Sequence, residues 1–187
     1  MTRRRGANVR RCCRQLRAFA CVCVGLASLV WSGCGGDAPQ GPPSLDGAAL
    51  VLADFDSLRI QLTDGSGEVR DSDGVLLSRA ALTEWRVVRD LDDDGQLDAL
   101  VVAWSSGGGS GTFMELAHLV LDEGDVPHWI WRGSIALGDR VRIRAMTESS
   151  GRVELHVTRH GPDDPMCCPT VDASLGFEVV GGRLTER

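Results

Sequence analysis

Along residues 49–187 apolar side chains alternate with polar ones or form short β-branched runs, and turn residues separate the runs. Alternation with a period of two is typical of strands that bury one face. The run RVRIR at 140–144 is the clearest case, with one basic and one apolar face. Nine strands are predicted in all, at 49–55, 58–63, 85–91, 97–104, 112–121, 129–137, 140–146, 153–159 and 175–180.

The connections between these segments are short and lack helical crossovers. Hairpin turns are predicted at Asp64-Gly65, Ser150-Gly151 and Gly181-Gly182. Only residues 77–84 suggest a short helix. The sequence therefore predicts a mainly β fold, an antiparallel sheet or sandwich, or an α+β variant of it with that one helix.

The N-terminal segment has a different pattern. Residues 1–17 hold seven arginines and no acidic residue, and residues 18–31 are 14 uncharged, mostly apolar residues. A span of about 20 apolar residues is needed to cross a bilayer, so this stretch is typical of a signal peptide instead. It ends in the small residues Ser32 and Gly33, followed by Cys34.

This junction resembles the lipobox of bacterial lipoproteins, in which Leu-Ala/Ser-Gly/Ala precedes a lipid-modified cysteine. Trp31 departs from that pattern, because it stands where the family favours leucine. The resemblance implies that residues 1–33 are removed and that Cys34 carries the lipid, with an uncleaved helical anchor as the alternative. It also implies an exported protein anchored to the membrane of the cell envelope, on its periplasmic or extracellular side.

Residues 34–48 then comprise the lipidated cysteine and a Gly/Pro/Ser-rich stretch, which predicts a flexible tether. The β-rich globular domain is expected to span residues 49–187. Without residues 1–33 the chain holds 13 arginines against 26 acidic residues, whereas the whole chain has a net charge of −6. Such an acidic domain repels nucleic acid, so no nucleic-acid partner is expected.

An aspartate-rich segment is the sharpest chemical signal. Oxygen ligands at alternate positions suit a hard cation that gathers six to eight oxygens. The segment resembles the calcium loops of EF-hands, dockerins and FG-GAP repeats, although Val101 stands where an EF-hand has its bidentate glutamate. Weak calcium binding, about 10⁻⁴–10⁻³ M, is therefore expected, with a solvated turn as the alternative. The predicted ligands are Asp90, Asp92, Asp94, the carbonyl of Gln96, and Asp98.

Five of the seven cysteines lie in the leader or at Cys34, which leaves the adjacent pair Cys167 and Cys168. Neighbouring Cα atoms are about 3.8 Å apart, whereas disulfides prefer roughly 4.4–6.8 Å, so a bond here would be comparatively easy to reduce. The pair predicts a vicinal disulfide or inert thiols, redox-responsive thiols, or a soft-metal site with His160 and Met166.

Candidate catalytic groups are sparse. The histidines are scattered, and the glycine-rich stretch at 105–112 lacks a Walker lysine and predicts a mobile hairpin loop. No catalytic residue and no enzymatic activity are therefore predicted. Trp129 and Trp131 share a strand face, which predicts core packing or a platform for stacking a glycan.

Four segments occur in the order DLDDDGQLDALVVAW, SGGGSGTFMELAHLVL, LGDRVRI and HGPDDPMCCPT. This order resembles that of an uncharacterised bacterial exported domain, over about residues 88–182. The resemblance implies export and a β fold. The resulting hypothesis is a membrane-anchored lipoprotein with a noncatalytic, calcium-stabilised β domain that binds an envelope protein or glycan. The alternative is a redox- or metal-responsive envelope lipoprotein that uses Cys167 and Cys168.

Overall fold

The computed structural model describes residues 41–52 and 58–187. The predicted leader and Cys34 lie outside the described residues, and so do residues 53–55 of the first predicted strand. Within the described part of the chain, no helix is both long and apolar enough to cross a membrane. The only helical element described is a short 3-10 turn, η1, at Leu45–Gly47.

Eleven strands follow η1 and make up the rest of the regular structure. They are β1 (Ala49–Leu52), β2 (Leu58–Gln61), β3 (Ser66–Arg70), β4 (Leu76–Arg89), β5 (Asp98–Ser106), β6 (Phe113–Asp122), β7 (His128–Asp139), β8 (Arg142–Ser149), β9 (Arg152–Arg159), β10 (Val171–Val180) and β11 (Arg183–Glu186).

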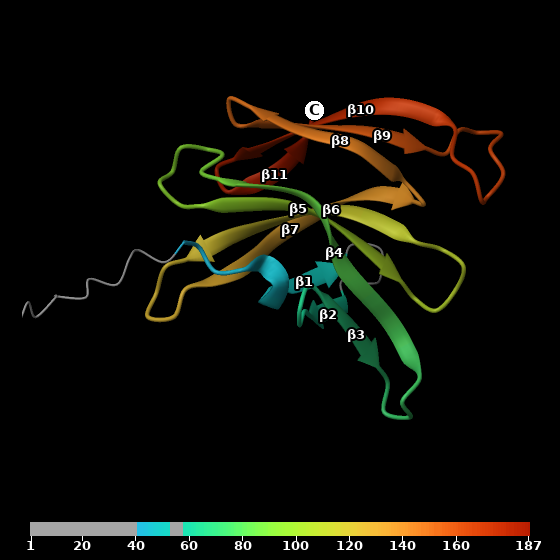
Figure 1. The fold of residues 1–187 in the computed structure, drawn as a ribbon, viewed down its shortest axis with the longest axis horizontal. Coiled ribbons are helices and arrows are strands. Elements are labelled where there is room, and N and C mark those ends of the chain that lie inside the picture. The colour runs from blue at the N-terminus through green and yellow to red at the C-terminus, as the bar shows by residue number, and fades with distance from the viewer. Residues whose placement is uncertain (1–40, 53–57) are drawn as a thin grey trace, which may run out of the picture. The chain divides into compact units, whose positions relative to one another are not determined.

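All strand pairs are antiparallel, and they form three sheets. A five-stranded sheet has the order β3-β4-β5-β6-β7, a four-stranded sheet has the order β11-β10-β9-β8, and β1 pairs with β2. Each sheet is a meander of sequential neighbours, as expected for strands joined by short turns. Figure 1 shows the four-stranded sheet on one side of the five-stranded sheet and the β1–β2 pair on the other. The prediction of a mainly β, antiparallel fold is confirmed.

The five-stranded sheet is covered on both faces, which explains the continuous apolar run in β5. Leu100 and Val102 of β5 pack against the four-stranded sheet, including Leu155 and Phe177. The alternate residues of the run face the β1–β2 pair in a second core cluster. Full burial of each such large apolar side chain contributes about 1.5–3 kcal/mol, so β5 is the centre of the packing.

The segment before β1 belongs to the packed domain. Leu45 is only 3% exposed and lies in the same core cluster as Trp129. The indole nitrogen of Trp129 donates a hydrogen bond of 2.8 Å to the carbonyl oxygen of Pro43. The prediction of a flexible tether reaching residue 48 is therefore wrong over residues 43–48, because a single buried leucine is not recognisable in a Gly/Pro/Ser-rich stretch.

The two tryptophans of β7 take part in this core. Trp129 is 6% exposed, and Trp131 packs against the same cluster. Their shared strand face is confirmed, and it faces the interior. The rings are used for packing and do not form an exposed platform for stacking a sugar.

The predicted helix at 77–84 is wrong. These residues lie in β4, a 14-residue strand that pairs with β3 on one side and with β5 on the other. The segment is rich in alanine, leucine, arginine and glutamate, which favour helices, but sheet pairing on both sides overrides a weak local propensity. A register shift between Leu82 and Arg86 marks where the strand bends.

The three predicted hairpin turns are confirmed. Each has both central residues in the left-handed region, as a two-residue type I′ turn requires. The backbone φ angles are 51° and 75° at Asp64 and Gly65, 54° and 77° at Ser150 and Gly151, and 55° and 71° at Gly181 and Gly182.

Candidate functional site

The aspartate-rich segment forms the loop between β4 and β5. The carboxylate of Asp90 accepts hydrogen bonds from the backbone N–H groups of Asp94 at 3.2 Å and Gly95 at 2.9 Å. Asp93 and Gly95 adopt left-handed backbone angles, with φ of 58° and 89°. Asn, Asp and Gly are the residues that tolerate this region best, so the sequence itself favours the tight loop.

Three of the predicted ligands converge. One carboxylate oxygen from each of Asp90, Asp92 and Asp98 lies within 4.8 Å of the other two. Asp94 is not in this group, and its carboxylate accepts hydrogen bonds from the Gln96 backbone at 2.8 Å and side chain at 3.4 Å. The structure thus brings together the carboxylates of three of the four predicted aspartates, and the fourth, Asp94, is paired with Gln96.

Asp98 is held from two further directions. It is 3% exposed, and its Oδ1 lies 2.8 Å from Nε2 of His118, which is fully buried in β6. Its Oδ2 accepts a 2.9 Å hydrogen bond from the backbone N–H of Leu91. The prediction omitted His118. The available signal was a histidine within the apolar run of a predicted strand, where a polar group requires a partner.

The same loop also connects the two larger sheets. Asp92 Oδ2 accepts a 2.9 Å hydrogen bond from the backbone N–H of Gly182, in the turn between β10 and β11. Arg89, at the end of β4, forms a 2.6 Å ion pair with Glu148 of β8. Gly151 packs closely on the loop, since a Cβ atom there would lie 2.6 Å from the Leu91 carbonyl oxygen. The carboxylates therefore lie at the junction between the sheets.

Glu148 is an electrostatic anchor of this junction. It accepts a 2.9 Å hydrogen bond from the Gly151 N–H as well as the bond from Arg89. Two hydrogen bonds hold the pKa of the Glu148 carboxyl below its ordinary value. The bond from the Gly151 N–H has the larger effect, and the bond from Arg89 has the next largest. Glu148 is thus ionised and fixes the β8–β9 turn beside the aspartate loop.

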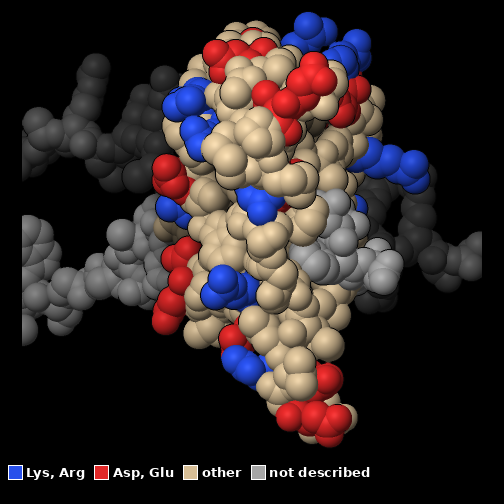
Figure 2. Space-filling view, turned by 90° about the vertical axis from the view of Figure 1, so that its right-hand side faces the viewer, with Lys and Arg blue, Asp and Glu red and all other residues tan. Residues whose placement is uncertain are grey.

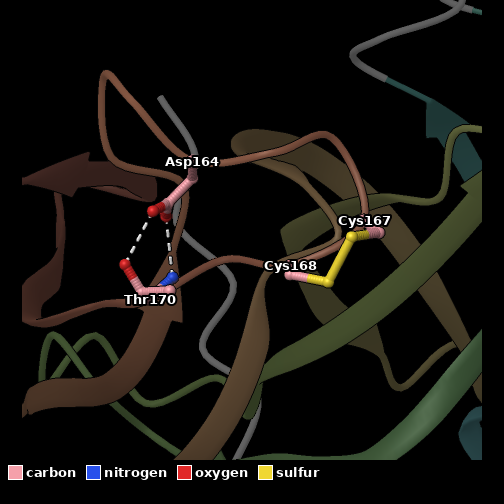
Figure 3. Close-up of a disulfide and its surroundings, with 4 residues drawn as sticks. All are labelled: Asp164, Cys167, Cys168 and Thr170. Carbon is pink, nitrogen blue, oxygen red and sulfur yellow. Dashed lines mark hydrogen bonds between the residues drawn. A yellow bond between two sulfur atoms is a disulfide. The ribbon is translucent and has the colours of Figure 1, made fainter.

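The second predicted site is the loop between β9 and β10. Cys167 and Cys168 form a disulfide between adjacent residues, with Cα atoms 3.8 Å apart. Beside it, the Asp164 carboxylate accepts hydrogen bonds from the Thr170 backbone at 2.8 Å and hydroxyl at 2.7 Å, as Figure 3 shows. The vicinal disulfide, one of the alternatives predicted for this pair, is thus present.

Asp164 closes the base of this disulfide loop. A third hydrogen bond to its carboxylate, of 2.8 Å, comes from the Gly161 N–H. This bond has the largest effect in lowering the pKa of the Asp164 carboxyl, and the bond from the Thr170 hydroxyl has the next largest. The oxygens of Asp164 are thus engaged within the loop.

The glycine-rich stretch connects β5 and β6 and is fastened at one end. Thr112 N–H donates a 2.9 Å hydrogen bond to the Asp139 carboxylate, and Arg140 N–H donates a 2.7 Å bond to the Thr112 carbonyl. The Arg140 side chain also donates to the carbonyl of Ser110. The LGDR and SGGGSGT segments therefore contact each other. The loop is a hairpin connection held by these hydrogen bonds, and it lacks the features of a phosphate site.

The face shown in Figure 2 carries arginine and acidic side chains near one another. Acidic side chains lie at its upper and lower ends and along its left edge, and arginines are interspersed among them, including at the top. No continuous basic surface forms on this face of the described domain.

The outer face of the four-stranded sheet contains an open groove of about 510 Å³. In it, Ser174 Oγ lies 2.8 Å from His156 Nδ1, and His156 Nε2 lies 3.7 Å from Glu154. Such a row resembles a hydrolytic triad in residue type only. Strand β9 lies between β8 and β10, so its backbone N–H groups are used in the sheet.

In comparisons with protein-family models, curated proteins and solved structures, nothing matches this chain. The fold and the site therefore define its class directly. The described chain is an antiparallel β protein with a carboxylate-rich loop at the junction of two sheets and a vicinal disulfide in a separate loop.

Proposed function

We propose that this chain is an exported, membrane-anchored lipoprotein whose noncatalytic β domain binds calcium at the junction of its sheets. The single observation that carries the calcium proposal is the convergence of carboxylate oxygens from Asp90, Asp92 and Asp98 within 4.8 Å. Like charges at this spacing repel one another, and a bound cation removes the repulsion. Carboxylate oxygen is the ligand type that calcium prefers.

The surroundings of the three carboxylates support this assignment. The Asp90 side chain is oriented by two loop N–H groups, and Asp98 is oriented by Leu91 and His118. Ligands whose positions are fixed in advance lose less conformational entropy when the ion binds. Three carboxylates leave several of calcium's six to eight positions for backbone carbonyls and water, which is consistent with weak binding of about 10⁻⁴–10⁻³ M.

The contact between Asp92 and Gly182 supports a structural role for the ion. Calcium held by Asp90, Asp92 and Asp98 would join the end of β4, the start of β5 and the β10–β11 turn. A ligand that binds only the folded state stabilises it by mass action. The ion would therefore hold the two sheets together while the domain binds an envelope protein or glycan.

The anchoring part of the proposal depends on the sequence. An arginine-rich leader, a 14-residue apolar stretch and Ser32-Gly33-Cys34 together support cleavage and lipidation at Cys34. Lipid attachment would place the domain at the membrane surface of the cell envelope. Mass spectrometry of the native protein tests this directly, since an intact residue 1–33 segment would contradict it.

The calcium proposal predicts a calcium-dependent melting temperature of the full chain. For a dissociation constant of about 10⁻⁴ M, 10 mM calcium stabilises the fold by about 2.7 kcal/mol, and for 10⁻³ M by about 1.4 kcal/mol. At roughly 2–4 °C per kcal/mol, the expected increase over chelator-treated protein is about 3–11 °C. Differential scanning calorimetry in chelator, calcium and magnesium measures it.

Two variants of one loop make the test specific. Asp92→Asn removes a ligand charge while its side-chain oxygen can still accept the Gly182 N–H, and it should abolish most of the calcium-dependent increase. Asp93→Asn is the matched control, because Asp93 is outside the carboxylate group and asparagine tolerates its φ of 58°. An equal calcium response in both variants, or no response in the wild type, would contradict the assignment.

A further inference from the structure

We propose that the Cys167–Cys168 disulfide is a two-electron redox site that exchanges with external dithiols, and that its reduction alters only the turn at 165–169. Both cysteines are exposed, and the neighbouring Met166 is 73% exposed. Thiol–disulfide exchange requires access of an attacking thiolate to one of the two sulfurs. The exposed position of this bond provides that access without unfolding.

The Cys167–Cys168 disulfide does not stabilise the fold as a whole. A disulfide stabilises a protein mainly by restricting the unfolded chain, and the effect grows with the number of residues in the closed loop. The sequence separation here is one, so the loop contains no intervening residue. Breaking the bond therefore leaves the entropy of the unfolded chain almost unchanged, and a global stabilising role does not explain its presence.

Bonds that do not involve sulfur hold the surrounding loop. Asp164 accepts three hydrogen bonds from Gly161 and Thr170, which join the two ends of the loop. Pro169 is buried, and the Cys168 N–H donates a 2.9 Å hydrogen bond to the Pro165 carbonyl. Because the Asp164 hydrogen bonds join Gly161 and Thr170 outside the turn at 165–169, reduction of the disulfide alters this turn while the β9–β10 hairpin remains formed.

The exchange is balanced with a dithiol as the reductant. A thiolate of the dithiol attacks one cysteine sulfur, the Cys167–Cys168 bond breaks, and a mixed disulfide forms. The second thiol of the reductant then displaces that cysteine, so the reductant becomes a disulfide and the protein gains two electrons and two protons as two thiols. The reverse exchange with an oxidised dithiol restores the bond.

The test uses the full chain in buffers of reduced and oxidised dithiothreitol, without denaturant. Free thiols are alkylated, and the protein is cut with an arginine-specific protease. The chain has no lysine, and the fragment at 160–183 contains Cys167 and Cys168 and no other cysteine. We expect an unlabelled fragment from the oxidised protein and a doubly labelled one from the reduced protein, with full reversal on reoxidation.

Two further measurements separate a redox site from a structural bond. The melting temperatures of the oxidised and reduced forms should differ by less than about 2 °C, since almost no loop entropy is involved. Met166→Ala, the matched exposed neighbour, should retain reversible labelling, whereas the Cys167→Ser/Cys168→Ser double variant should show none.

Three outcomes would overturn the proposal. Labelling before any reduction would mean that the native chain carries free thiols. Reduction only after denaturant is added would mean that the bond does not exchange in the folded protein. A fall of 10 °C or so in melting temperature on reduction would assign the bond a global stabilising role instead.

Discussion

Replacement of His118 by leucine tests how far the buried Asp98 carboxylate depends on the imidazole. His118 is fully buried and Asp98 is 3% exposed, with 2.8 Å between Nε2 and Oδ1. Removing His118 leaves the buried Oδ1 of Asp98 without its hydrogen-bond partner, at a cost of about 1–3 kcal/mol, and more for a charged carboxylate. Leucine fills much of the imidazole volume, so most of the loss would arise from the unpaired carboxylate. The expected fall in melting temperature is on the order of 10 °C.

Urea unfolding of a double-mutant cycle measures this dependence. The cycle compares the wild type, His118→Leu, Asp98→Asn and the double variant, all in the presence of chelator. Because the two side chains are in direct contact, a coupling free energy of about 1–3 kcal/mol is expected. The loss in the double variant should accordingly be smaller than the sum of the two single losses.

A cavity variant on the opposite face of the five-stranded sheet is the control. Leu50 of β1 is fully buried in the other core cluster, so Leu50→Ala should cost about 2–5 kcal/mol through cavity formation. Its effect should add to that of Asp98→Asn within about 0.5 kcal/mol. A His118→Leu variant within 1 kcal/mol or so of the wild type, or a coupling no larger than that of Leu50→Ala, would refute the reasoning.

Two further predictions concern the junction between the sheets. The lowered pKa of Glu148 means that its stabilising contribution is present above its unfolded pKa, near 4.5, and is lost as the pH falls through the folded value. The stability difference between the wild type and Glu148→Gln should therefore shrink as the pH falls below about 5 in urea titrations, and a difference that stays constant at low pH would contradict this. Gly151→Ala should destabilise more than Gly181→Ala in thermal melts. Both positions have positive φ and incur about 1–2 kcal/mol, but only at Gly151 would the new Cβ meet backbone, 2.6 Å from the Leu91 oxygen. Equal losses of stability in the two variants would show that the structure relieves the contact with the Leu91 oxygen without further destabilisation.

Periodicity was sufficient to predict the strands that bury an apolar face, and it failed where no such face exists. The edge strands β3 and β11 were not predicted, because Ser66–Arg70 alternates only between exposed and half-buried positions and Arg183–Glu186 is mostly exposed. Residues 77–84 were predicted as a helix, since local propensity does not register the two neighbouring strands that pair with them.

The candidate site was predictable to the extent that it is local. Spacing within nine residues predicted Asp90, Asp92 and Asp98. The contact of Asp98 with His118 spans 20 residues, and that of Asp92 with Gly182 spans 90, so no local pattern contains them. Asp94 lies outside the converging group, and its carboxylate accepts two hydrogen bonds from its neighbour Gln96.

The burial of Leu45 and the hydrogen bond from Trp129 to Pro43 also limit the length of the tether between Cys34 and the packed domain. If the lipid is on Cys34, Pro43, which accepts the hydrogen bond from Trp129, lies nine positions further along the chain. A fully extended chain covers at most about 3.6 Å per residue, so Pro43 would stay within roughly 32 Å of the acyl anchor. Any molecule that the domain recognises would then have to come close to the bilayer surface, because the domain could not reach far across the envelope to meet it.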